Sequence, residues 1–139
     1  MAARELFLDA SYLIALTVPA DEHHRRAREL ARRVETDSRL LVTTQPVLFE
    51  VGDALCRPRQ REAAVRLLDA LAADPKVVIV PVDDELYDRA VDLFRKRGDK
   101  EWSLTDCLSF VVMGDFDLAE SLTTDDDFEQ AGFTALLRH

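Results

Sequence analysis

Long apolar runs, glycine and proline are all scarce in this sequence. Its longest uninterrupted apolar stretches span only a handful of residues, which excludes a transmembrane helix. The first residues, Met-Ala-Ala-Arg-Glu, run directly into an apolar strand pattern without a signal-peptide segment, so we expect a cytoplasmic protein. The four glycines and five prolines are scattered and form no linker. A chain of 139 residues with this composition is therefore expected to fold as a single domain, residues 1–139.

Cysteine and histidine are also rare. Cys56 and Cys107 lie in predicted helices without a CxxC spacing, so buried free thiols are expected in preference to a disulfide or a zinc site. Two of the three histidines are adjacent and the third is C-terminal. There is no Ser/His/Asp or Cys/His pattern, no P-loop and no GxGxxG run. The sequence therefore does not favour a hydrolase with a serine or cysteine nucleophile, or a nucleotide-binding protein of these classes.

Positive charge is in deficit. A formal net charge of −9 and a pI near 4.8 argue against binding nucleic acid by bulk electrostatics. The arginines are nevertheless grouped, from Arg25 to Arg39, from Arg57 to Arg66 and from Arg95 to Lys100. Most of these side chains are expected on solvated helix faces, but local positive patches can coexist with an acidic centre.

Short apolar runs alternate with helical patterns along the whole chain. A helix capped by Ser11 is expected from Tyr12 to Leu16, and another from Glu62 to Ala73. The expected strands are Leu6–Leu8, Leu40–Thr43, Val77–Val80, Ser121–Thr124 and Thr134–Leu137, of which the third is expected to be fully buried and the last to lie at an edge. This order predicts an α/β fold, a three-layer sandwich with a central, mostly parallel sheet of four to five strands.

Carboxylates stand at the ends of these strands and in the first turns of the helices. Asp9 directly follows the first strand, and Asp125 begins a run of three acids after the fourth. Glu50 borders the apolar stripe of its helix. Asp106 has the capping-box spacing from Ser103, which is a structural explanation for it, but the helix that follows is apolar nearly all round. In a right-handed α/β sheet, all four acids can point toward one end.

Several unpaired carboxylates cannot remain ionised in one pocket without a counter-charge. A hard divalent cation can supply it, and Mg²⁺ is typically held by a few carboxylates together with waters and phosphate oxygens. Such a centre can activate a water and stabilise charge on a phosphate. The pattern therefore predicts phosphodiester hydrolysis.

Four segments carry a family resemblance: L-F-L-D-A-S, T-T-Q-P-V-L-F-E, D-K-E-W-S-L-T-D-C-L-S and L-T-T-D-D-D-F-E-Q-A-G-F. They resemble, in order and spacing, the signature segments of the PIN-domain ribonucleases, and in particular the VapC-like toxins of bacterial toxin–antitoxin pairs. The resemblance runs from about residue 5 to the C-terminus. It implies that the catalytic and metal-binding acids are Asp9, Glu50, Asp106 and Asp125. It also implies Asp127 as a further metal ligand, with Ser11 and Thr123 as supporting hydroxyls.

The same resemblance implies dependence on Mg²⁺ or Mn²⁺, an RNA substrate, a homodimer and a cognate antitoxin that occludes the acidic pocket. Two other classes remain open. A receiver-like signalling module also has an acidic Mg²⁺ pocket, but it needs paired acids after the first strand and a lysine after the fifth, which this chain lacks. A PIN-like fold that only binds a partner would keep the architecture without catalysis.

Overall fold

The computed structural model describes residues 5–138, and its centre is a parallel sheet of five strands in the order β3-β2-β1-β4-β5. All four strand pairings are parallel. The strands are β1 (Leu6–Leu8), β2 (Leu41–Thr44), β3 (Val77–Val80), β4 (Glu120–Leu122) and β5 (Thr134–Ala135). The predicted α/β class and central parallel sheet are confirmed.

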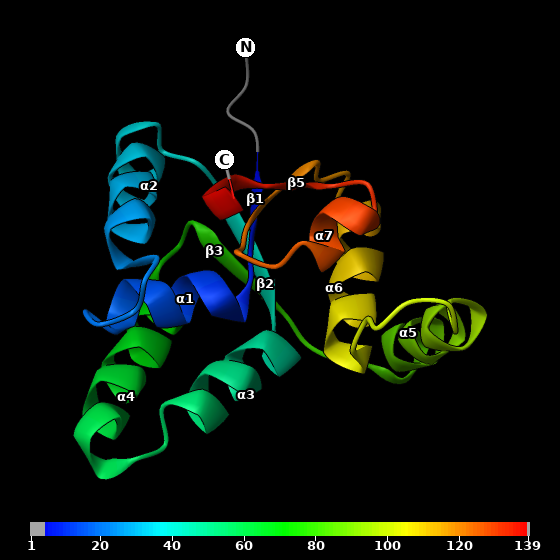
Figure 1. Ribbon diagram of the computed structural model, residues 1–139, viewed down its shortest axis with the longest axis horizontal. Coiled ribbons are helices and arrows are strands. Elements are labelled where there is room, and N and C mark those ends of the chain that lie inside the picture. The colour runs from blue at the N-terminus through cyan, green and yellow to red at the C-terminus, as the bar shows by residue number, and fades with distance from the viewer. Residues whose placement is uncertain (1–4, 139) are drawn as a thin grey trace.

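Helices cover both faces of this sheet, as Figure 1 shows. They are α1 (Ala10–Thr17), α2 (His24–Thr36), α3 (Gln45–Ala54), α4 (Pro58–Ala73), α5 (Asp84–Lys96), α6 (Leu104–Asp115) and α7 (Asp127–Gln130), followed by a 3₁₀ turn at Leu136–Arg138. In Figure 1, α1, α2 and α4 lie to the left of the strands and α5, α6 and α7 to the right. Helix α3 continues from β2 at the lower end and contacts α1, α4 and α6. No helix within residues 5–138 is both long and apolar enough to cross a membrane.

Strand β1 is central because all three of its side chains are apolar and buried. Its neighbours on the two sides, β2 and β4, supply its hydrogen bonds. A strand without a polar face needs cover on both sides, which is the situation in the middle of a parallel sheet. The chain leaves this strand through Asp9, so the first acid is placed at the most enclosed point of the carboxyl edge.

Strand β3 corrects one expectation. Its four β-branched residues predicted a fully buried strand, but it lies at the edge of the sheet, pairs only with β2 among the described strands, and leaves Val78 45% exposed. Four β-branched residues in a row suit a central and an edge strand equally, because the local pattern does not contain the strand order.

Several expected boundaries also differ. Helix α1 begins at Ala10 with Asp9 at its N-cap, so Ser11 is inside the helix and does not cap it. Helix α4 begins four residues earlier than expected, at Pro58. Cys56 is exposed in the connection before this helix, whereas Cys107 is buried as expected. The final strand is shorter than expected, since the chain turns into the 3₁₀ helix after Ala135.

An aromatic cluster joins the elements that carry the acids. The ring of Phe128 on α7 packs edge-on to Phe110 of α6, with centroids 5.0 Å apart, and lies 6.2 Å from the ring of Phe7 on β1. Phe110 in turn meets Trp102, which precedes α6, at 5.0 Å. Edge-to-face contacts of this kind add to the free energy of burial and fix ring orientation. The starts of α6 and α7 are therefore held at fixed positions against the central strand.

Replacing Phe128 by Ala should lower the free energy of unfolding by about 3–5 kcal/mol, because it leaves a cavity between three packed elements. Phe94→Ala on α5, where the ring is 49% exposed, is the matched control and should change this free energy by about 0.5 kcal/mol or less. Urea titrations of both variants measure the two values. Equal losses would contradict the placement of Phe128 in the core.

Candidate metal centre

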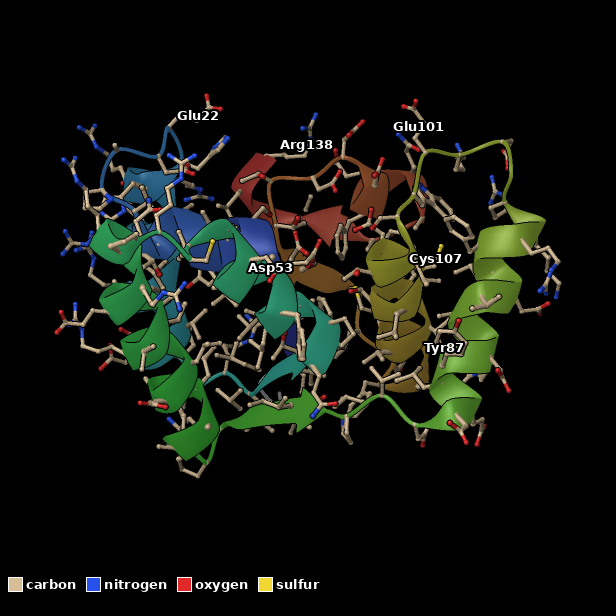
Figure 2. All side chains as sticks on the ribbon, turned by 90° about the horizontal axis from the view of Figure 1, so that it is seen from below. Glu22, Asp53, Tyr87, Glu101, Cys107 and Arg138 are labelled. Carbon is tan, nitrogen blue, oxygen red and sulfur yellow. The ribbon has the colours of Figure 1, made fainter. Side chains whose placement is uncertain are left out.

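The acids meet at the carboxyl edge of the sheet, the edge that Figure 2 views from below. Asp106 lies in the first turn of α6, Asp127 is the first residue of α7, and Asp125 lies in the loop between β4 and α7. One carboxylate oxygen from each of these three residues lies within 4.8 Å of the other two. The first turn of α6 and the segment that leads into α7 thus present acidic oxygens to one small volume.

Asp9 is the most enclosed acid of the group, with only 6% of its surface exposed. Its Oδ2 accepts hydrogen bonds from Thr123 Oγ1 at 2.7 Å and from Ser11 Oγ at 2.8 Å. Burial raises the pKa of the Asp9 carboxyl, while the bonds from Thr123 and Ser11 oppose the rise. The two hydroxyls predicted as supports therefore hold this carboxylate in place.

The same two hydroxyls organise the acidic loop after β4. Ser11 Oγ accepts the backbone N–H of Thr124 at 3.0 Å, and Thr123 Oγ1 accepts the N–H of Asp125 at 3.0 Å. The loop then folds back on itself, since the Asp127 N–H donates to Asp125 Oδ1 at 2.9 Å. Each hydroxyl has one proton, which it gives to Asp9, and lone pairs, which it offers to the loop. Asp9 and Asp125 are thereby tied together through shared hydroxyls.

Asp106 caps its helix, as its spacing from Ser103 predicted, and it also lies among the clustered acids. The capping box is present, with the Asp106 N–H bound to Ser103 Oγ at 3.0 Å and the Ser103 N–H bound to Asp106 Oδ2 at 3.3 Å. Burial, together with the charges of Asp125, Asp9 and Asp127, nevertheless raises the pKa of Asp106 to about 7. A purely structural cap at the surface would not carry such a shift.

Glu50 and Asp127 lie at the margin of the group. Glu50 is exposed as a residue, yet partial burial of its carboxyl and the charges of Asp9, Asp125 and Asp53 raise its pKa to about 7. Burial and the charge of Asp125 raise the pKa of Asp127 as well. The charges of the acidic cluster therefore act on the Glu50 carboxyl, although Glu50 is outside the closest group of three acids.

The charges that act on these acids all come from other carboxylates. Among the described residues, no lysine, arginine or histidine contributes to the pKa shifts of Asp9, Glu50, Asp106 or Asp127. Clustered, partly desolvated carboxylates without a cation favour either protonation or a bound metal ion. The donors are all hard oxygens at a spacing that one ion can bridge, so the residues fit Mg²⁺ or Mn²⁺.

The sequence predicted these acids, but it ranked them differently from their distances in the structure. It treated Asp127 as an addition and Glu50 as a full member, whereas the closest oxygens belong to Asp106, Asp125 and Asp127. It also gave no role to Phe49, an exposed aromatic residue beside Glu50. One signal was available for Phe49, because this aromatic residue lies off the apolar stripe of its own helix.

This chain belongs to the PIN-domain family, since the family's sequence model matches residues 6–134. That match spans the five strands and all the acids described above, apart from the last residue of β5.

The chain shares only a modest sequence identity with individual members of the family. The chain is 28% identical, over 92% of its own length and 95% of the relative's, to the 23S rRNA-specific endonuclease VapC20 of Mycobacterium tuberculosis, found in two strains. The crystal structure of VapC20, described as a sarcin-ricin loop cleaving toxin, superposes with a TM-score of 0.82 at 27% identity, covering 93% of this chain and 96% of that one. The fold and the nuclease family are thus shared.

The raised pKa of Asp106 predicts a pH-dependent stability of the metal-free protein. Between about pH 4 and pH 7 the folded state keeps a proton that the unfolded state has lost, so this group's contribution falls as the pH rises. The free energy of unfolding of Asp106→Asn, relative to that of the native chain, should therefore rise over this pH range and stay constant above it. Urea titrations in EDTA at several pH values measure the difference, and a pH-independent difference would refute the assignment.

Mg²⁺ or Mn²⁺ should raise the melting temperature of the native chain above pH 7, because binding only to the folded state stabilises it. Asp106→Asn and Asp125→Asn should reduce this increase. Asp69→Asn, an exposed acid on α4, is the control and should keep it. An increase that persists in both site variants would place the ion elsewhere.

Proposed function

We propose that this protein is a metal-dependent endoribonuclease, the toxin of a toxin–antitoxin pair, which hydrolyses RNA phosphodiester bonds in the cytoplasm as a single PIN-like domain. The observation that carries the proposal is the convergence of the Asp106, Asp125 and Asp127 oxygens within 4.8 Å beside the buried Asp9. Within residues 5–138, only other carboxylates act as charges on the pKa values of Asp9, Asp106 and Asp127. The likeness to VapC20, described as a ribosomal RNA endonuclease, supports the same class of substrate.

Each residue has a distinct part in this proposal. Asp106, Asp125 and Asp127 hold the ion, with Asp9 and Glu50 completing the negative wall on the side of α1 and α3. When bound, the ion supplies an activated water and neutralises charge on the phosphate. Ser11 and Thr123 keep the Asp9 carboxylate oriented toward the acidic loop.

The proposed partners follow from the same assignment. A homodimer and a cognate antitoxin are proposed by analogy with the VapC-like family. A segment of the antitoxin that carries a cationic side chain would suit the acidic centre, because the described acids there have no cation of their own. Arginines and lysines that are clustered in the sequence would neutralise the phosphates of the RNA.

Cleavage of a mixed RNA pool tests the function. The native chain with Mg²⁺ or Mn²⁺ should cut RNA, EDTA should abolish cutting, and Asp9→Asn and Asp106→Asn should lose at least about a hundredfold in rate, because each removes charge from the centre. Asp69→Asn, prepared identically, should cut as the native chain does.

Cutting by Asp9→Asn at the native rate would reveal a contaminating nuclease. If no protein cuts any RNA in the pool, although metal binding is intact, the PIN-like fold would act as a binding module only.

A further inference from the structure

A groove of about 400 Å³ opens directly beside the acidic centre. One wall is a single face of α3, and the other is formed by the loop after β3 and the first turn of α6. Its lining residues are Gln45, Pro46, Phe49, Glu50, Asp53, Val82 and Thr105. Glu50 belongs to both the groove and the acidic wall, and Thr105 directly precedes Asp106. A ligand whose phosphate lies at the acids would therefore place its neighbouring group in this groove.

Phe49 gives the groove an open aromatic surface. The side chain is 70% exposed, the largest value among the described large hydrophobic residues, while Val47 and Val51 on the opposite face of α3 are completely buried. The Phe49 ring therefore contributes little to the packing of the core. Pro46 and Val82 continue the apolar surface around it. An exposed ring of this kind is a platform on which a planar base can stack.

The polar groups of the groove favour a ligand that donates hydrogen bonds. Gln45 Oε1 already accepts the Val82 N–H at 3.2 Å, which fixes its side chain across the groove. Asp53, which Figure 2 labels on α3, and Glu50 add carboxylate oxygens that only accept hydrogen bonds when ionised. The Asp53 carboxylate also repels a phosphate, so an uncharged group suits this groove better than the sugar–phosphate chain does. An uncharged ring with N–H groups on its edge is the ligand that satisfies both conditions.

We propose that this groove binds one unpaired RNA base next to the scissile phosphate, stacked on Phe49 and read by the Asp53 carboxylate. The proposal rests on the proposed ribonuclease function and adds to it a subsite for the base. Guanine fits best, because its adjacent N1–H and N2–H donors match the two oxygens of one carboxylate, whereas uracil presents a single N–H. A protein partner is less suited, since a stable interface takes about 20–30 residues on each side and seven residues line this groove.

Cleavage kinetics test the stacking surface. Phe49→Ala should lose about tenfold to a hundredfold in kcat/KM on an oligoribonucleotide that the native chain cuts, as expected for removing one base-stacking ring. Phe49→Trp should retain most of the rate and Phe49→Leu should not, because only the first keeps an aromatic face. Phe94→Ala, a half-exposed aromatic residue on α5, is the control and should cut at the native rate.

Binding without cleavage tests the proposal separately from catalysis. In EDTA, the fluorescence of Phe49→Trp, corrected for the buried Trp102 of the native chain, should be quenched by uridine-rich oligoribonucleotides that carry one guanosine. All-uridine oligomers should quench less, and inorganic phosphate should not quench at all. Asp53→Asn, introduced into the same variant, should reduce the preference for guanosine.

The outcomes separate the two proposals. Normal cleavage by Phe49→Ala would overturn the base subsite and leave the ribonuclease function standing. If Phe49→Ala cuts at the native rate but has a different molar mass in solution from the native chain, the base subsite would also be overturned, in favour of a contact between protein chains. If the native chain cuts no RNA, the ribonuclease function fails, and quenching by the oligomers then decides alone whether the groove binds a base.

Discussion

Burial of the Asp9 carboxylate at the end of the central strand is the constraint on which the site depends. A charged group in such a place needs hydrogen bonds, and Ser11 and Thr123 supply them from helix α1 and from the end of β4. The same hydroxyls accept backbone N–H groups of the loop that carries Asp125. The hydrogen bonds that the buried Asp9 requires thus also hold the loop that presents Asp125.

The acidic centre combines local rigidity with electrostatic repulsion. The aromatic contacts of Phe7, Phe110 and Phe128 fix the starts of α6 and α7 against β1, so the carboxylates cannot separate to relieve their repulsion. Their raised pKa values express the cost, which is largest when no cation is bound. A divalent ion held by these acids would relieve their repulsion, which is the physical reason that the cluster suits a metal site.

Helix α3 packs one face against the core and presents the other to the acidic cluster and the adjacent groove. Val47 and Val51 anchor one face, while the other presents Glu50 to the acids and Phe49 and Asp53 to the adjacent groove. Thr44 begins the helix at the end of β2 by accepting the Val47 N–H. Because the start of the helix is fixed at the carboxyl edge of the sheet, the direction of all three side chains follows from the helical period.

The sequence by itself determined the fold class, the strand Leu6–Leu8 and the acids that follow the strands, because apolar runs, helical periodicity and capping spacings are local patterns. The tertiary structure decided what depends on neighbours distant in the chain. It placed Val77–Val80 at an edge, since strand order is absent from the pattern of any one strand. It placed Ser11 inside helix α1 instead of at its N-cap, with the hydroxyl donating to Asp9, and it brought Asp127 into the closest group of acids in place of Glu50. The closeness of Asp106 to Asp125 and Asp127 arises only when α6 and α7 pack together, because no local pattern in the sequence relates acids that lie on separate elements.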